Sequence, residues 1–183
     1  MTIEIFKNWI NVLIKPKEVF AQEKGNASLG KAIKIILIAG LIAGTFHLVA
    51  SFILFDVFSF YSMGIIFAPI WLLITSGIYY IFAKLLKGKG NFTTQTYLAA
   101  LVSAPCMLIS AAISIFPFIG AIIIFPVFYE LYLLTLALRE VHQYSTARAI
   151  LSWLIPMLII IIVVIIVLVV VFMSIISSRN PNI

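Results

Sequence analysis

Charged side chains are scarce in this sequence. Only 10% of its 183 residues are Asp, Glu, Lys or Arg, whereas 64% are hydrophobic, and the mean hydropathy is +1.23. A soluble domain keeps roughly a quarter of its residues charged because its surface faces water. A chain of this composition cannot cover itself with polar groups. We therefore expect it to lie in a bilayer.

Cysteine and histidine are also scarce. Cys106 is the only cysteine, which excludes an intrachain disulfide framework. Its neighbours in SAPCMLIS are apolar, so we predict a structural thiol. The two histidines show no metal-ligand spacing. The sequence contains no nucleophile elbow, HExxH motif or carboxylate pair, and KGKGNF lacks the Walker spacing. We expect no enzyme activity, catalytic residue, metal or cofactor.

The net charge of +6 comes from 12 basic and six acidic residues. No basic stripe interleaved with aromatics occurs, so nucleic acid is not an expected partner. Basic residues beside membrane spans are expected from topology and from attraction to anionic head groups. The expected partner is therefore a bilayer with anionic head groups.

Five apolar segments are long enough to cross a bilayer, which takes about 20 residues. The sequence predicts an all-α, polytopic bundle of five transmembrane helices, with residues 1–31 forming an amphipathic segment and residues 32–183 the membrane domain. The third and fourth spans are separated only by SIFPFIG, where Pro117 and Gly120 favour a tight turn. The predicted spans are 32–55, 62–86, 97–115, 118–138 and 150–176.

The basic residues predict the orientation of these spans. Eleven of them fall in the N-terminal segment or in the second-to-third and fourth-to-fifth connections, and only Arg179 falls on the opposite side. Lys and Arg accumulate on the cytoplasmic side of membrane proteins. We predict a cytoplasmic N-terminus and an outside C-terminus, in the cell membrane, or in an endomembrane if the source is eukaryotic.

The N-terminal segment has its own helical pattern. Apolar and aromatic residues from Ile3 to Ile14 share one arc, opposite Glu4, Lys7 and Lys15. Pro16 ends this helix and can begin a second short one. The pattern suits a helix at the membrane interface and equally a helix docked under the bundle.

In the last span, the stretch IPMLIIIIVVIIVLVVVFM contains no small-xxx-small pattern and no polar side chain after Pro156, whereas close helix packing in membranes usually uses Gly, Ala, Ser or Thr. The first and third spans have them, in IAGLIAGTFH and YLAALVSAPCMLISAAIS. We predict a core formed mainly by the first four spans, with the fifth more exposed to lipid.

Glu130 is the unusual residue of the fourth span. It lies eight residues from the cytoplasmic end, about 12 Å deep at 1.5 Å per residue. Tyr79, Tyr80 and Ser103 lie at similar depth, so Glu130, Ser103 and one tyrosine can form a hydrogen-bonded cluster. Either Glu130 binds or relays a proton or cation, or it is a partnered carboxyl that fixes helix packing. The sequence favours packing because it offers no further ionisable group at this depth.

His47 completes the intramembrane polar cluster that the sequence predicts. It lies in the first span, nearer the outer face. It can pair with Asp56, titrate as a switch, or bond a neighbouring hydroxyl or carbonyl group.

Three stretches, taken in order, resemble one known family. KPKEVF before the first span, KGKGNFTTQTYLAALVSAP entering the third and LALREVHQYSTARAI after the fourth are similar to the Yip-domain family of five-span membrane proteins, related to Rab-GTPase-interacting proteins. The resemblance implies membrane organisation or recruitment of partners. Its compact length is similar to that of the prokaryotic branch.

On this resemblance the cytoplasmic loops face a protein partner or lipid, or their basic residues only fix topology. In the second of these cases Thr93 or Thr94 only caps the third span. The alternative function is a transporter of a small solute, ion or lipid built around Glu130, and a homo-oligomer is left open. The loop residues are Lys87, Lys89, Arg139, His142 and Arg148, with Glu140 and Tyr144 beside them.

Overall fold

The computed structural model of the chain describes residues 2–53, 64–114, 116, 122 and 124–179. Within these residues it is helical and contains no strand, which confirms the all-α prediction. Two short helices and a 3-10 turn precede five longer helices. The elements are α1 (Thr2–Ile14), α2 (Pro16–Glu23), η1 (Lys24–Asn26), α3 (Leu29–Ile53), α4 (Gly64–Leu85), α5 (Phe92–Ser114), α6 (Ile124–His142) and α7 (Thr146–Arg179).

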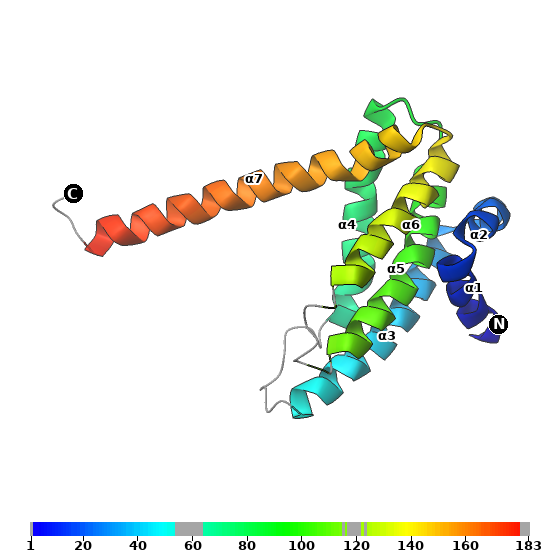
Figure 1. Cartoon of the computed structure of the whole chain (residues 1–183), viewed down its shortest axis with the longest axis horizontal. Helices are drawn as coiled ribbons and strands as arrows, with labels where there is room; N and C mark the ends of the chain where they lie inside the picture. The colour runs from blue at the N-terminus through cyan, green and yellow to red at the C-terminus, as the bar shows by residue number, and fades with distance from the viewer. Residues whose placement is uncertain (1, 54–63, 115, 117–121, 123, 180–183) are drawn as a thin grey trace.

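Helix α5 is the central element of the bundle. It packs most extensively against α3 and also contacts α1, α4 and α6 (Figure 1). Both α3 and α5 bury small residues, among them Ala39, Ala43, Ala100 and Ala104, each at most 3% exposed. Small side chains let helix backbones approach closely in a membrane. The buried alanines of α3 and α5 thus allow the close packing of these two helices in the core that we predicted for the first spans.

Helix α7 differs from the rest in its exposure. It leaves the bundle and extends away from it (Figure 1). From Leu158 to Ile176 every side chain is exposed. The exposure that we predicted for the last span is confirmed, and lipid is the environment that this apolar surface requires.

Four helical segments in the described part of the chain are long and apolar enough to cross a membrane: Leu29–Ser51, Phe67–Leu85, Phe92–Ser114 and Thr146–Ile176. Helix α6 is not among them, since its 19 residues include three charged ones. Several residues predicted for the start of this span (118–121 and 123), the turn at Pro117 and Gly120, and Asp56 lie outside the described residues. A bundle with multiple spans is therefore confirmed, and the count of five stays a prediction.

The N-terminal helices are docked on the bundle. Trp9 and Val12 of α1 are buried against it, and the Tyr129 hydroxyl of α6 donates a hydrogen bond to the Leu13 carbonyl oxygen at 2.5 Å. The outer side of α1 stays apolar, because Phe6, Ile10 and Ile14 are 39%, 57% and 70% exposed. Both sequence-based alternatives are therefore represented: α1 packs on the bundle and still presents an apolar stripe. As predicted, Pro16 begins α2.

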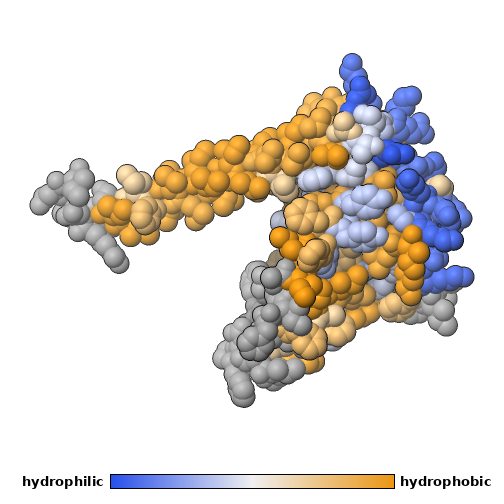
Figure 2. Space-filling model, in the orientation of Figure 1, coloured by the Kyte–Doolittle hydropathy of each residue, from blue (hydrophilic) through white to orange (hydrophobic). Residues whose placement is uncertain are grey.

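Hydrophilic side chains gather on one side of the molecule, over α1 and α2 and over the neighbouring ends of the bundle helices, whereas α7 points away from that side (Figure 2). Two contacts join the basic segments there. Lys24 Nζ of η1 lies 2.5 Å from Glu140 Oε1 of α6, and the Lys89 amide donates to the His142 carbonyl oxygen at 3.1 Å. We call this side the polar face.

Labelling of single introduced cysteines tests the orientation and the span count. Because Cys106 is buried, it should give little background with a membrane-impermeant maleimide. Cysteines at Lys17, Lys87 and Arg148 should react only when the cytoplasmic side is accessible, and a cysteine at Arg179 only from the other side. Labelling of positions 87 and 148 from opposite sides would show that only one of α5 and α6 crosses the bilayer.

Candidate functional site

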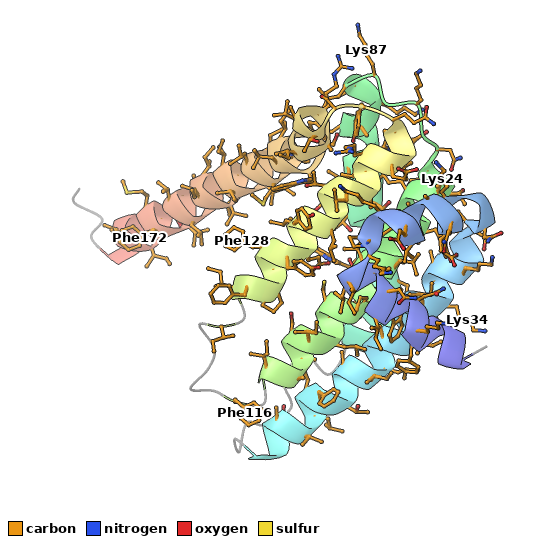
Figure 3. All side chains as sticks on the ribbon, turned by 45° about the vertical axis from the view of Figure 1, so that its right-hand side comes forward. Lys24, Lys34, Lys87, Phe116, Phe128 and Phe172 are labelled. Carbon is orange, nitrogen blue, oxygen red and sulfur yellow. The ribbon has the colours of Figure 1, made fainter. Side chains whose placement is uncertain are left out.

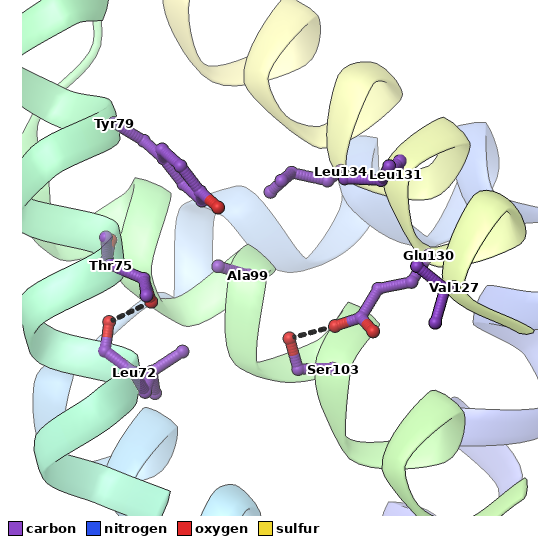
Figure 4. Close-up of a pocket in the computed structure, with 10 residues that line it drawn as sticks. Leu72, Thr75, Tyr79, Ala99, Ser103, Val127, Glu130, Leu131 and Leu134 are labelled. Atoms are coloured by element: carbon purple, nitrogen blue, oxygen red, sulfur yellow. Dashed lines mark hydrogen bonds between the residues drawn. The ribbon is translucent and has the colours of Figure 1, made fainter. Parts of the chain in front are cut away.

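Glu130 of α6 points into the bundle toward α5 (Figure 4). The Ser103 hydroxyl donates a hydrogen bond to Glu130 Oε1 at 2.7 Å. Among the described residues, only Ser103 forms a hydrogen bond with the Glu130 side chain. A carboxyl in a low-dielectric setting needs such a partner, since burying it alone is unfavourable. The depths estimated from the sequence therefore paired Glu130 with the serine that it contacts in the structure.

Two cavities adjoin this pair. The smaller one, of about 190 Å³, lies between α4, α5 and α6 and is lined by Tyr79 and Thr75 as well as Ser103 and Glu130. The hydroxyl of Thr75 turns back to its own helix and donates to the Trp71 carbonyl oxygen at 2.8 Å. In Figure 4 the Tyr79 hydroxyl points toward the same space. Tyr79 is thus the tyrosine that shares this level with Glu130.

The larger cavity, of about 660 Å³, extends between α3 and α4. His47 lines it, and a hydrogen bond of 3.3 Å joins its Nδ1 to Ser114 Oγ. The walls are otherwise mainly apolar, with Trp71 and Met107 among them. In the part of the chain that the structure describes, no three His, Cys, Asp or Glu side chains come together as a metal site would require.

Tyr80 does not join the Glu130 cluster. Its ring packs edge-on against Phe92 with centroids 5.7 Å apart, and Lys84 Nζ lies 5.4 Å from its centroid. One residue along a helix turns a side chain by about 100°, so adjacent tyrosines face different neighbours. Tyr80 therefore faces Phe92 and Lys84 rather than Glu130, and including it in the cluster around Glu130 was wrong.

His142 was predicted to face partners, and this prediction was wrong, because its side chain is 0% exposed. Helix α6 continues four residues past the predicted end of its span, so His142 sits on the last turn and faces α4 and α5. Its Nε2 lies 2.7 Å from Gln95 Oε1. Tyr144, also expected in a partner-facing loop, is only 9% exposed and bonds Ser152 at 2.8 Å.

A chain of hydrogen bonds continues from His142 into the bundle. Gln95 Nε2 donates to the Ser76 carbonyl oxygen at 2.7 Å, and the hydroxyls of Ser76 and Thr96 are 2.8 Å apart. This His142 network links α6, α5 and α4. Gln95, Ser76 and Thr96 were not singled out from the sequence. The available signal is Gln95 in TTQT, which is an amide at the start of an apolar helix.

The network defines the state of the imidazole ring. Since the Gln95 amide nitrogen donates to Ser76, the Gln95 oxygen accepts, and His142 Nε2 must carry the proton. Nδ1 then carries no proton, and within the described residues this buried atom has no hydrogen-bond partner. Burial, followed by the nearby Lys84 charge, lowers the pKa of His142 to about 4. The ring is therefore neutral near pH 7.

The α4–α5 connection closes over this ring through two glycines. A Cβ on Gly88 would lie 2.5 Å from His142 Nδ1 and 2.8 Å from the Ala83 carbonyl oxygen, and one on Gly90 would collide with Val141. Lys87, just before them, adopts a φ of 64° at the end of α4. Asn91 then caps α5, since its Oδ1 accepts from the Thr94 amide at 2.8 Å. The cap expected at Thr93 or Thr94 is thus supplied by Asn91.

The basic residues of the loops project from this closed end. Lys87 and Lys89 are exposed, and so are Arg139 and Arg148. Arg139 donates to the Thr146 hydroxyl at 3.2 Å, which ties the end of α6 to the start of α7. Lys24 and Lys87 are labelled on this side in Figure 3.

A family model described as the Yip1 domain matches residues 10–176. The chain belongs to the Yip1-domain family. Comparison with curated proteins and comparison with solved structures each give no match. Membership and the apolar helices together make the chain a multi-pass membrane protein of Yip type.

The matched region defines what this Yip1 domain contains. It begins inside α1 and ends inside α7, so it includes the Glu130–Ser103 pair, the His142 network and both glycines of the α4–α5 connection. The resemblance based on three loop motifs is thereby confirmed at the level of the family.

Replacing Gly88 with alanine tests the closed end of this Yip1 domain. The added methyl group must displace His142 or the backbone at Ala83, so we expect a loss of about 1–3 kcal/mol in the free energy of unfolding. Thermal unfolding in detergent would measure it. Gly25→Ala is the matched control, because a Cβ there meets nothing within 4 Å. Equal midpoints for the two variants would contradict the close packing of Gly88.

The His142 pKa predicts how stability depends on pH. The folded chain resists protonation down to about pH 4, whereas the unfolded chain takes up the proton near pH 6.5. The unfolded state thus binds more protons in this window, and stability must fall as the pH is lowered from 6.5 to 4. His142→Gln should show a shallower fall in thermal midpoint over the same window. A slope unchanged by the substitution would contradict this assignment.

Proposed function

We propose that this Yip-type membrane protein is a non-enzymatic scaffold that organises membranes by recruiting protein partners at its cytoplasmic face. The observation that carries the proposal is the construction of the polar face. Segments far apart in the sequence meet there through the Lys24–Glu140 ion pair and the Lys89–His142 backbone bond. These contacts hold exposed basic residues from distant segments in one surface.

Rigidity of the loops supports this proposal. The exposed Lys87 and Lys89 stand on a connection whose glycines pack on the His142 ring. Arg139 is held by its bond to Thr146. Holding charged side chains on a fixed base lowers the entropy lost when a partner binds. The charges themselves would increase the rate of encounter with an acidic partner.

The cytoplasmic location of this surface is part of the proposal. It depends on the eleven basic residues that the predicted topology assigns to one side. The gathering of hydrophilic side chains on one side of the molecule supports it (Figure 2). Glu130 then acts as a packing group that joins α6 to α5 through Ser103. We do not propose transport, because no observation of the described residues favours it over packing.

Photo-crosslinking in cells tests the scaffold. A photoreactive residue at Ala147, which is exposed between Arg139 and Arg148, should yield an adduct with a specific protein. The same residue at Ile162, on the apolar part of α7, serves as the background. Changing Lys87, Lys89, Arg139 and Arg148 to glutamine should reduce the adduct roughly tenfold or more, since attraction between complementary charges is lost.

Two controls make the crosslinking result specific. Glu130→Gln retains an oxygen that can accept from Ser103 and should leave the adduct unchanged. The fourfold variant must keep wild-type labelling at position 17, because removing basic residues can alter topology. An adduct at Ala147 no stronger than that at Ile162, or one insensitive to the four charges in correctly oriented protein, would refute the proposal.

A further inference from the structure

A groove of about 720 Å³ lies between the N-terminal helices and the bundle, at some distance in sequence from the loops discussed above. It is bounded by α1, by the end of α2 with η1, and by α3 and α5. Its lining combines lysines, side-chain amides and an apolar floor. The polar residues are Lys7, Asn8, Asn11, Gln22, Glu23, Asn26, Lys31 and Lys34.

The groove carries excess positive charge. Among the described residues, three lysines and one glutamate line it, which gives 3 − 1 = +2. The glutamate is already engaged: Glu23 Oε1 accepts from Asn8 Nδ2 at 3.1 Å, and its Oε2 accepts from the Tyr97 hydroxyl at 2.6 Å. Both carboxylate oxygens thus have donors from the protein. The lysines Lys7, Lys31 and Lys34 are all exposed.

Ammonium and amide groups give the groove donors that suit a phosphate. Lys31 Nζ donates to the Asn26 carbonyl oxygen at 2.7 Å, which fixes one ammonium at the rim. Figure 3 shows Lys34 on α3 beside α1, which crosses in front of the bundle. Lysine binds phosphate as a compact charge with three donors, and basic pockets between membrane helices bind anionic head groups.

The rest of the groove suits an acyl chain. Its floor includes Ile5, Ile35 and Leu101. On the neighbouring side of α1, the exposed stripe of Phe6, Ile10 and Ile14 presents apolar surface, which is the pattern of a helix at a membrane interface. A soluble anion would use the lysines and leave this surface in water. An amphiphile uses both.

We propose that this groove binds one anionic phospholipid, with its phosphate held by Lys7 and Lys34 and the adjacent amides, and its acyl chains beside the apolar stripe of α1. The lipid would join α1 to α3 and so fasten the N-terminal helices to the bundle. The site does not include the loop residues Lys87, Lys89, Arg139 and Arg148 that face the proposed partner, so either site can fail without the other.

Native mass spectrometry of the full-length protein in detergent tests this lipid site. The probes are phosphatidylglycerol, phosphatidylcholine and glycerol 3-phosphate, each titrated separately. We expect one phosphatidylglycerol to bind at least tenfold more tightly than phosphatidylcholine. The double variant Lys7→Gln and Lys34→Gln should lower that affinity roughly thirtyfold, from about 1 kcal/mol per lysine near an anionic surface.

The matched control has the same change in net charge outside the groove. Lys15→Gln with Lys17→Gln removes two exposed lysines that do not line it and should leave phosphatidylglycerol binding unchanged. Equal losses in the two double variants would show a general charge effect and overturn the site. Equal binding of the two phospholipids would overturn it as well. Glycerol 3-phosphate binding as tightly as the lipid would show a site for a soluble phosphate instead.

The crosslink at Ala147 separates this proposal from the proposed function. The groove variant should keep that adduct, because its substitutions leave the polar-face loops unchanged.

Discussion

The close packing of α3 against α5 determines where the polar groups of this protein lie. Membrane helices gain little from hiding apolar surface, since lipid is apolar too, and their association depends on close contact and hydrogen bonds. The buried alanines of both helices permit that approach. With α5 held at the centre, Ser103 meets Glu130 on one side and Tyr97 meets Glu23 on another.

Two levels of polar contact follow from this arrangement. Deep in the bundle, one carboxyl and one hydroxyl join α6 to α5. At the polar end, the His142 network joins three helices, and the glycines of the α4–α5 connection close over it. The first level has few donors and acceptors to offer a ligand. The second holds the exposed basic residues in fixed positions, which suits contact with another molecule.

The lengths of the apolar helices and the depth of Glu130 in the bundle could be predicted correctly from the sequence. The apolar runs of α3, α4, α5 and α7 are 19 to 31 residues long, which is enough to cross a bilayer. Counting residues from a span end placed Glu130 level with Ser103. The lack of a small-xxx-small pattern in the last span predicted the exposure of α7, because such a surface has nothing to pack closely with. These inferences need only local periodicity and length.

The errors arose where a side chain's surroundings depend on other helices. His142 reads as a loop residue until α6 is seen to continue beyond the span, which turns the ring inward onto Gln95. Tyr79 and Tyr80 share a depth but not a direction. The groove beneath α1 was not predicted, because it is formed by residues from five elements whose relative positions the sequence does not encode locally.

The length of α7 has a mechanical consequence for the surrounding bilayer. The predicted span 150–176, which begins after the exposed Arg148, has 27 residues, which is about 40 Å of helix at 1.5 Å per residue. The hydrocarbon layer is about 30 Å thick. A straight, upright α7 would therefore exceed the hydrocarbon layer by roughly 10 Å, so the helix must lean, or the lipids around it must stretch. Because the side chains from Leu158 to Ile176 are exposed, this part of α7 can lean without displacing the buried side chains of the described bundle.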